Sequence, residues 1–186
     1  MKRETSFATK LDAVPTSPFR ATLVRRVALS PLISSGLVDF LFTSGRPNRF
    51  NPSGVRCVYF AGNEATAAAE YERHTRPLQQ PFATFYAEVS LARVLDLGST
   101  AIRKCLVVTL AGIQANWIRS ATLTVTQRLG NAVSQQSRIA AIRFPSEAMR
   151  MTGKSGFNVV IFRDCLNAPD FVRIIGPTRK AIQEWP

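Results

Sequence analysis

The chain has 186 residues, of which 46% are hydrophobic and 19% charged, and it carries a formal net charge of +12. This length and composition are typical of one globular domain and exclude a disordered chain. No apolar run reaches the 18 residues of a membrane span, and no apolar segment follows the first residues as in a secretory signal, so we expect a cytoplasmic protein. The basic residues are scattered, so the charge indicates a preference for anions without specifying which anion.

The three cysteines, Cys57, Cys105 and Cys165, lie far apart in apolar stretches, and His74 is the single histidine. Their number and spacing fit neither a disulfide framework nor a zinc site. We therefore expect reduced, mostly buried thiols and no metal centre. His74 follows the end of a predicted helix, where a histidine interacts with the helix dipole, and receives no functional role.

The first part of the chain is predicted from its turn residues and its apolar spacing. Residues 1–20 are polar and carry two prolines, so we expect a loose lead-in, followed by a single domain over residues 21–186. Residues 23–29 alternate as a strand does. Residues 34–42 have apolar residues at helical spacing, and the glycine-, proline- and asparagine-rich residues 44–54 form a loop.

The remaining elements mix strands and helices without regular alternation, which predicts an α+β fold with a mixed or antiparallel sheet flanked by helices. A helix is predicted over residues 63–73, because Asn63 can cap it and Glu64 suits its first turn. A turn and short helix are predicted over 96–104, and a helix over 120–133. Strands are predicted over 56–61, 82–94, 139–144, 157–162 and 172–175.

Three side chains on consecutive elements form a candidate site. Arg49 lies in the loop, Tyr59 in the following strand and Glu70 on the helix after it. Alanines precede Glu70, and an alanine-lined helix packs closely, which favours an inward carboxylate. The alternatives are a surface arginine, a core tyrosine with a satisfied hydroxyl and a solvated helix glutamate.

These residues carry a resemblance to a known family. Arg49-Phe-Asn-Pro-Ser-Gly, then Tyr59-Phe-Ala, then Thr66-Ala and Glu70, resemble the opening of the RES-domain toxins, which are named for an arginine, a glutamate and a serine. Ile142-Arg-Phe-Pro-Ser146, followed by Asn158-Val-Val-Ile-Phe162, is similar to the serine turn and strand of the family. Trp117 and Thr126-Gln127-Arg-Leu-Gly130 resemble its middle helix. The resemblance spans residues 24–164.

The arginine positions depart from the family pattern. The family commonly has Gly-Gly-Arg-Trp where this chain has Arg46-Pro-Asn-Arg49-Phe, so both arginines are candidates, and the following Asn51-Pro-Ser-Gly favours Arg49. For the arginine of the first strand, Arg26 matches best and Arg25 is the alternative. Arg26, Arg46 and Asn51 are therefore taken as candidate substrate-binding residues.

The resemblance implies an ADP-ribosyltransferase-like fold that binds NAD⁺ as substrate and cleaves its nicotinamide–ribose bond. The acceptor of the ribosyl group would be water or inorganic phosphate, with no cofactor. It also implies a toxin that is blocked by a helix-turn-helix antitoxin in an oligomeric complex, with no membrane and no direct nucleic-acid binding. Two alternatives stay open: transfer of ADP-ribose to a protein, and a basic nucleic-acid-binding module suggested by the net charge alone.

The implied chemistry suits the candidate residues. Cleavage leaves an oxocarbenium-like ribosyl cation, which a carboxylate such as Glu70 stabilises. A guanidinium grips a pyrophosphate with paired hydrogen bonds, a role for Arg49 with Arg26. An aromatic face such as that of Tyr59 suits the cationic nicotinamide ring. Ser146 would hydrogen-bond to ribose or nicotinamide, although it could instead only cap a turn beginning at the next residue.

Overall fold

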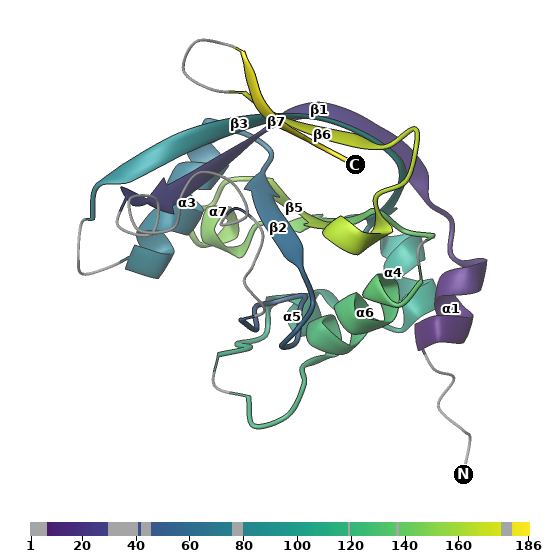
Figure 1. Cartoon of the computed structure of the whole chain (residues 1–186). Helices are drawn as coiled ribbons and strands as arrows, with labels where there is room; N and C mark the ends of the chain where they lie inside the picture. Colours follow the sequence, from purple (N-terminus) through teal and green to yellow (C-terminus); the bar gives the residue numbers. More distant parts are fainter. Residues whose placement is uncertain are drawn as a thin grey trace.

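The computed structural model describes residues 7–29, 41, 46–75, 80–118, 120–136, 138–175 and 180–186 (Figure 1). Its strands are β1 (Ser17–Ala28), β2 (Cys57–Ala61), β3 (Phe82–Asp96), β4 (Ala141–Pro145), β5 (Phe157–Phe162), β6 (Phe171–Ile175) and β7 (Ala181–Trp185). Its helices are α1 (Phe7–Ala13), α3 (Glu64–Thr75), α4 (Thr100–Leu106), α5 (Leu110–Gln114), α6 (Val125–Ser134), α7 (Glu147–Met151) and the 3-10 helix η2 (Arg163–Cys165). The α+β prediction is confirmed.

The strands pair in the order β1-β2-β5-β4-β3-β6-β7, and β1 also pairs with β3 along almost its whole length. The pairings therefore close the first five of these strands into a ring, which β6 and β7 extend beyond β3. Only β3 and β4 run parallel among the described pairs; the other pairs are antiparallel. The sheet is mixed, as its irregular order of elements predicts.

Two hydrophobic cores lie on the two sides of the central strands. In Figure 1, β1, β3 and β6 arch over β2 and β5, and α5 and α6 lie beneath. Along β2, Cys57 and Tyr59 pack toward the helical side, and Val58 and Phe60 pack toward β1, β3 and β6. This alternation is the two-residue period of a strand that is buried on both faces.

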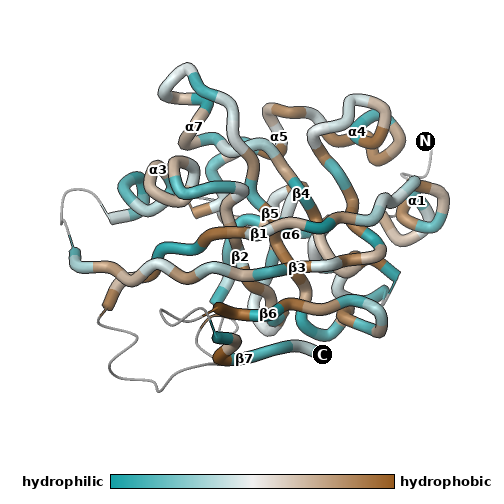
Figure 2. The backbone as a smooth tube through the Cα atoms, turned by 90° about the horizontal axis from the view of Figure 1, so that it is seen from above, coloured by the Kyte–Doolittle hydropathy of each residue, from teal (hydrophilic) through white to brown (hydrophobic). Residues whose placement is uncertain are grey.

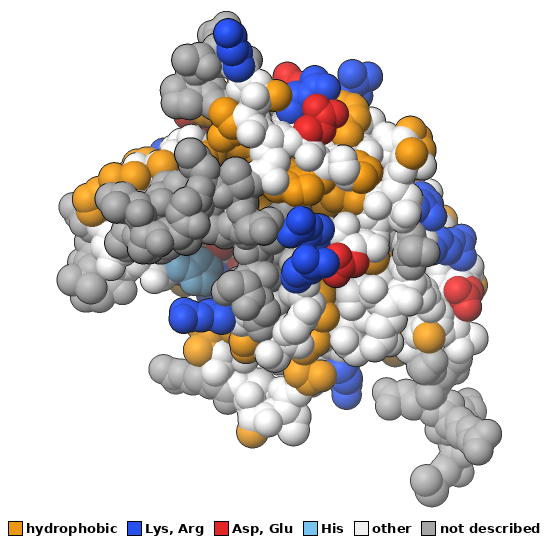
Figure 3. Space-filling view, viewed as in Figure 1, with side chains coloured by type: hydrophobic (Ala, Val, Ile, Leu, Met, Phe, Trp, Pro, Cys, Tyr) orange, Lys and Arg blue, Asp and Glu red, His pale blue; other side chains and the backbone are white. Residues whose placement is uncertain are grey.

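The ends of the molecule are occupied by different helices. Figure 2 shows α3 and α7 at one end of the long strands and α1 and α4 at the other, in agreement with the contacts between α3 and α7 and between α1 and α4. Lys and Arg side chains form several separate groups on the face shown in Figure 3 rather than one stripe. No helix in the part of the chain that the structure describes is long and apolar enough to cross a membrane.

Most predicted elements are confirmed, with shifted ends. The predicted helix over 63–73 is α3, and the side-chain oxygen of Asn63 accepts the Thr66 N–H at 2.8 Å. The predicted helix over 120–133 begins only at α6, where Thr124 and Gln127 form a capping box. The helix predicted over 34–42 falls outside the described residues except for Leu41.

The expected loose lead-in is wrong for residues 7–20. These residues form α1 and the first part of β1, because Leu11 and Val14 are buried in the helical core and Phe7 packs against it. Their helical spacing covers only two turns, too short to stand out from the polar residues around them. The thiols of Cys57 and Cys165 are buried as expected.

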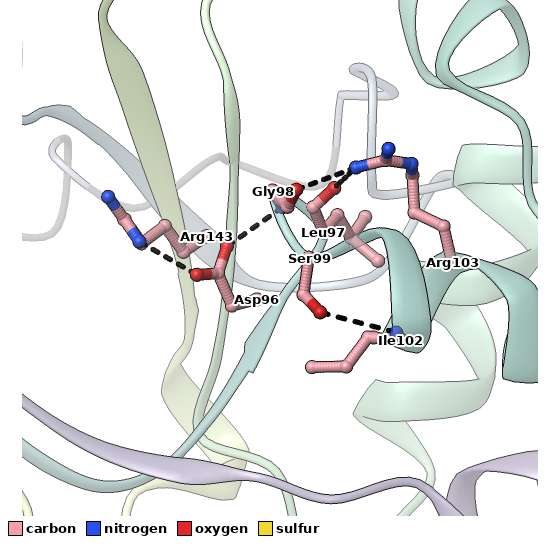
Figure 4. A network of polar contacts seen from close by, with 7 residues as sticks. All are labelled: Asp96, Leu97, Gly98, Ser99, Ile102, Arg103 and Arg143. Carbon is pink, nitrogen blue, oxygen red and sulfur yellow. Dashed lines mark hydrogen bonds and ion pairs between the residues drawn. The ribbon is translucent and has the colours of Figure 1, made fainter.

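A polar network joins the end of β3 to α4 (Figure 4). The Asp96 carboxylate accepts the Gly98 N–H and pairs with Arg143 of β4 at 2.7 Å. Ser99 caps α4, and Arg103 donates to two backbone carbonyls of the same turn. Because Asp96 and Arg143 are partners in the parallel register, this pair fixes β4 and hence the position of Ser146, three residues further on.

Candidate functional site

A cavity of about 650 Å³ lies between the second half of β1, β2, α3, the loop at residues 48–49 and residues 114–118. Sites for small molecules commonly have volumes of about 300–1,000 Å³. The cavity is lined by four arginines, Arg25, Arg26, Arg49 and Arg73, together with aromatic and aliphatic side chains. It is therefore suited to an anionic ligand with flat groups.

One face of α3 forms a wall of this cavity. Ala67, Glu70, Tyr71 and His74 all line it, and their spacing of three, four and seven residues places them on one side of a helix. The small Ala67 packs with Val24 and Ala61, so the helix approaches β1 and β2 closely. This close approach is the reason that Glu70 faces the cavity.

Glu70 is held by two hydrogen bonds to a single carboxylate oxygen. The Ser146 hydroxyl and the Asn158 amide each donate to Oε1 at 2.7 Å. Both donors are almost enclosed, with exposed fractions of 2% for Ser146 and 8% for Asn158. Among the described residues Oε2 has no hydrogen-bond partner, so the carboxylate is fixed in place with one oxygen left for a ligand. We call Glu70, Ser146 and Asn158 the carboxylate clamp.

Ser146 has two roles in this geometry. Its oxygen also accepts the Met149 N–H at 3.2 Å and so caps α7, which realises the alternative interpretation of this serine. It is not among the residues that line the cavity. The structure thus places Ser146 behind Glu70, where it orients the carboxylate, rather than in direct reach of a ligand as the sequence suggested.

Tyr59 joins the cavity to the loop before it. Its ring lines the cavity, while its hydroxyl donates to Asn51 Oδ1 and accepts the Phe50 N–H, both at 2.9 Å. Burial raises the pKa of Tyr59 well above its ordinary value. The hydroxyl therefore holds the loop, as in the interpretation of a satisfied core tyrosine, and the ring is the part that can meet a ligand.

The loop itself is held by hydrogen bonds within it and from α6. Asn51 is fully buried, and its amide donates to the Arg46 carbonyl at 2.8 Å. The Gln127 amide of α6 donates to the Asn48 carbonyl at 3.1 Å. Asn51 therefore builds the loop and does not line the cavity, which differs from its expected place among the substrate-binding residues.

Of the two candidate loop arginines, the structure places Arg49 at the cavity. Its guanidinium donates to the carbonyls of Ile113 and Ala115 at the end of α5. Burial lowers the pKa of Arg49, and the Glu70 carboxylate acts in the opposite direction. Arg46 is exposed and does not line the cavity, because it precedes the tight turn closed by Asn48 and Asn51.

Both candidate arginines of the first strand reach the cavity. The Arg25 guanidinium donates to the Tyr59 carbonyl at 3.0 Å, which ties β1 to β2. The Arg26 guanidinium carbon lies 4.5 Å from the centroid of the Phe82 ring. Arg25 and Arg26 therefore both line the cavity, but Arg25 is hydrogen-bonded to β2 whereas Arg26 lies over an aromatic ring.

Several lining residues were not predicted. Arg73 and His74 follow Glu70 by three and four residues, a spacing from which their shared helix face could have been read. Desolvation lowers the pKa of His74, and the nearby Glu70 carboxylate opposes that shift. Asn158 stands at the start of a predicted strand, but its contact with Glu70 spans 88 residues and has no local signal. In the described ranges, no group of three or more His, Cys, Asp or Glu side chains is placed to hold a metal ion.

The structure combines a clamped carboxylate with a basic cavity on an α+β scaffold with a mixed sheet, an arrangement suited to a small anionic ligand. Residues 24–185 match the RES domain, so the chain belongs to the RES domain family. The curated protein sequences contain no significant match to it.

Comparison with solved structures shows the same fold. A chain in the crystal structure of the M. tuberculosis MbcT–MbcA toxin–antitoxin complex aligns with a TM-score of 0.62 and 16% sequence identity. The alignment covers 97% of this chain and 91% of that chain. At this identity the likeness is one of fold, and it includes the N-terminal elements that precede the matched RES domain.

Proposed function

We propose that this protein degrades NAD⁺ by cleaving the bond between nicotinamide and ribose. The observation that carries the proposal is the carboxylate clamp, in which Ser146 and Asn158 fix one oxygen of Glu70 and leave the other free at the cavity. A fixed carboxylate is the group that stabilises a sugar cation, and fixing it in advance avoids reorganisation during the reaction. Membership of the RES domain family agrees with this chemistry.

The composition of the cavity suits this substrate. NAD⁺ carries a pyrophosphate, and guanidinium groups bind phosphate oxygens through charge-assisted hydrogen bonds. Arg26 and Arg49 supply such groups on two sides of the cavity, and the Tyr59 ring supplies a flat apolar surface for nicotinamide. Phosphate oxygens arriving at Arg49 compensate for the desolvation of its guanidinium.

The reaction follows from these positions. The C1″–N bond breaks, and its electron pair leaves with the nicotinamide nitrogen, which becomes neutral. The ribosyl carbon becomes cationic, and Glu70 stabilises the positive charge until an acceptor oxygen bonds to it. With water as acceptor, the products are ADP-ribose, nicotinamide and a proton; with inorganic phosphate, the product is ADP-ribose-1″-phosphate. The protein residues involved are a positioned carboxylate and its donors, so no further cofactor enters the proposal.

We propose further that the protein is a toxin that acts on the cytoplasmic NAD⁺ pool and is neutralised by an antitoxin. The structural neighbour comes from a toxin–antitoxin complex, and the cavity opens at the surface where a bound protein could cover it. A helix-turn-helix antitoxin and a larger assembly with it belong to this proposal. The separate basic groups of Figure 3 give no continuous surface for a nucleic-acid backbone on that face, which favours the enzyme over a binding module.

The test is to mix purified protein with NAD⁺ and to follow nicotinamide and the ribosyl product by chromatography. We expect nicotinamide release by the wild type, its loss in Glu70→Gln, and its retention in Glu72→Gln, a matched variant at an exposed position of α3 outside the cavity. Release with and without phosphate distinguishes the acceptors, and radiolabelled protein bands would reveal transfer to protein. Equal release by the wild type and Glu70→Gln would overturn the role of Glu70.

A further inference from the structure

An arginine that lines the cavity lies over one ring of an aromatic pair. The Arg26 guanidinium carbon lies 4.5 Å from the Phe82 ring centroid, and the ring of Tyr71 lies 5.2 Å from that of Phe82, tilted by 56°. Arg26 and Tyr71 line the cavity, whereas Phe82 does not. Phe82 therefore supports Arg26 from outside the cavity. We call these three residues the arginine platform.

The register of the sheet builds this platform. Arg26 pairs with Thr84, and Phe82 lies two residues before Thr84 on β3, so the side chains of Arg26 and Phe82 stand on the same face of the sheet as diagonal neighbours. The Tyr71 hydroxyl donates to the Gln80 carbonyl at 3.0 Å, which holds its ring beside Phe82. The platform is thus assembled from three separate segments, β1, α3 and the start of β3.

Arg26 differs from the other two arginines near the centre of the cavity. Arg25 and Arg49 both donate to backbone carbonyls, so their guanidinium groups are tied to the protein frame. The Nε of Arg26 is buried and has no hydrogen-bond partner among the described residues. A guanidinium plane with aromatic support on one side and a cavity on the other can stack on a flat ligand group and still donate from its edge.

The platform and the carboxylate clamp reach the same cavity, which Arg26 and Tyr71 line from the platform and Glu70 and Asn158 from the clamp. Val24 pairs with Ala61, which in turn pairs with Asn158 of the clamp. Arg26, the platform residue that lines the cavity, lies two residues beyond Val24 on β1. Two residues of an extended strand span about 7 Å, and Tyr71 directly follows Glu70 on α3, so a single dinucleotide can reach both places within the cavity.

We infer that Arg26, supported by Phe82 and flanked by Tyr71, binds the adenylate half of the dinucleotide by stacking on its purine ring. This inference rests on the proposed function, because it assigns the second half of the same substrate. The clamp then receives the nicotinamide ribose, and the pyrophosphate lies between the two, where Arg49 and the donating edge of the Arg26 guanidinium bind it. Purine rings stack readily on guanidinium and aromatic groups.

The test uses AMP, which is the adenylate half alone, and follows its binding by isothermal titration calorimetry. Phe82→Leu removes the aromatic support at a position that is 43% exposed, so the fold tolerates it. Arg26→Lys keeps the positive charge and removes the planar guanidinium group. The matched control is Phe171→Leu, because Phe171 carries a similar stack with Arg173, at 5.4 Å, outside the cavity.

We expect the dissociation constant for AMP to rise roughly tenfold in Phe82→Leu and Arg26→Lys and to stay unchanged in Phe171→Leu. In the nicotinamide-release assay, the KM for NAD⁺ should rise by a similar factor in Phe82→Leu, with kcat changed less than about twofold. Absence of AMP binding, or equal AMP binding by the wild type and both platform variants, would overturn the inference. AMP binding that depends on Arg26, without any nicotinamide release, would support the platform and refute NAD⁺ cleavage.

Discussion

Gly130 of α6 touches the backbone of the loop that carries Arg49. A Cβ atom added at this position would lie 1.6 Å from the Phe50 carbonyl oxygen, and an ordinary contact needs 3.4 Å, so the backbone must move by about 1.8 Å. Phe50 is fully buried in the helical core and cannot yield without disturbing it. Gly130→Ala therefore displaces the residue next to Arg49.

The size of the effect follows from two opposing terms. Alanine favours the helix by about 1 kcal/mol over glycine, and forcing an extra methyl group into a packed core costs about 1–3 kcal/mol. We expect a net loss of up to about 2 kcal/mol in the free energy of unfolding, measured in urea. Because a misplacement of about 1 Å can lower a rate by about 100-fold, kcat/KM for nicotinamide release should fall by at least that factor.

The control for this variant is Gly112→Ala in α5. A Cβ at Gly112 meets only side-chain atoms, at 3.2 Å, which can yield by a few tenths of an ångström. Its unfolding free energy and activity should stay close to those of the wild type. A Gly130→Ala protein with unchanged stability and unchanged kcat/KM would refute the view that close packing of α6 positions Arg49.

Three further predictions concern the clamp and the scaffold. Ser146→Ala removes a hydrogen-bond donor to the Glu70 carboxylate, so kcat should fall roughly 10- to 100-fold with little change in the dissociation constant for NAD⁺. A larger effect on the dissociation constant than on kcat would contradict an orienting role for Ser146. Burial raises the pKa of the Cys165 thiol from 9.0 to about 11, so its stabilising contribution is present below pH 9 and lost as pH rises from 9 to 11. The Cys165 thiol should therefore account for about 1.4 kcal/mol of the loss of urea-derived stability at pH 10, a share that disappears in Cys165→Ala and remains in Cys105→Ala. Val107 is a β-branched residue at φ 57° with 74% exposure. Val107→Gly should therefore raise the free energy of unfolding by about 0.5–1 kcal/mol, and the melting temperature should rise with it. A lower melting temperature would argue against strain at this position.

The sequence predicted those parts of the site that depend on local signals. Asn63 as a helix cap was sufficient to place α3, and the alanines before Glu70 favoured the inward carboxylate without excluding a solvated one. Arg49 and Tyr59 were placed in a loop and a strand from turn residues and β propensity. In each case the deciding physical effect acts within a few residues of the chain.

The parts that were not predicted depend on contacts between distant segments. The Tyr59 hydroxyl bonds to Phe50 and Asn51 of the loop, and Asn51 is buried rather than at the cavity. Both facts depend on how β2 packs against that loop. The contact of Asn158 with Glu70 and the support of Arg26 by Phe82 require the strand register, which pattern alone does not supply. The helix α5 spans little more than one turn and β7 is mostly exposed, so neither carries a clear apolar pattern.

The central claim is that Glu70 stabilises the ribosyl cation rather than the bound substrate. It is tested most directly by measuring NAD⁺ binding and nicotinamide release separately in the wild type and in Glu70→Gln, which keeps the shape of the side chain and removes its charge. We predict a dissociation constant for NAD⁺ within about threefold of the wild type and a kcat lower by about 100-fold or more. A variant that retains kcat, or one that loses binding and kcat in equal proportion, would contradict the account.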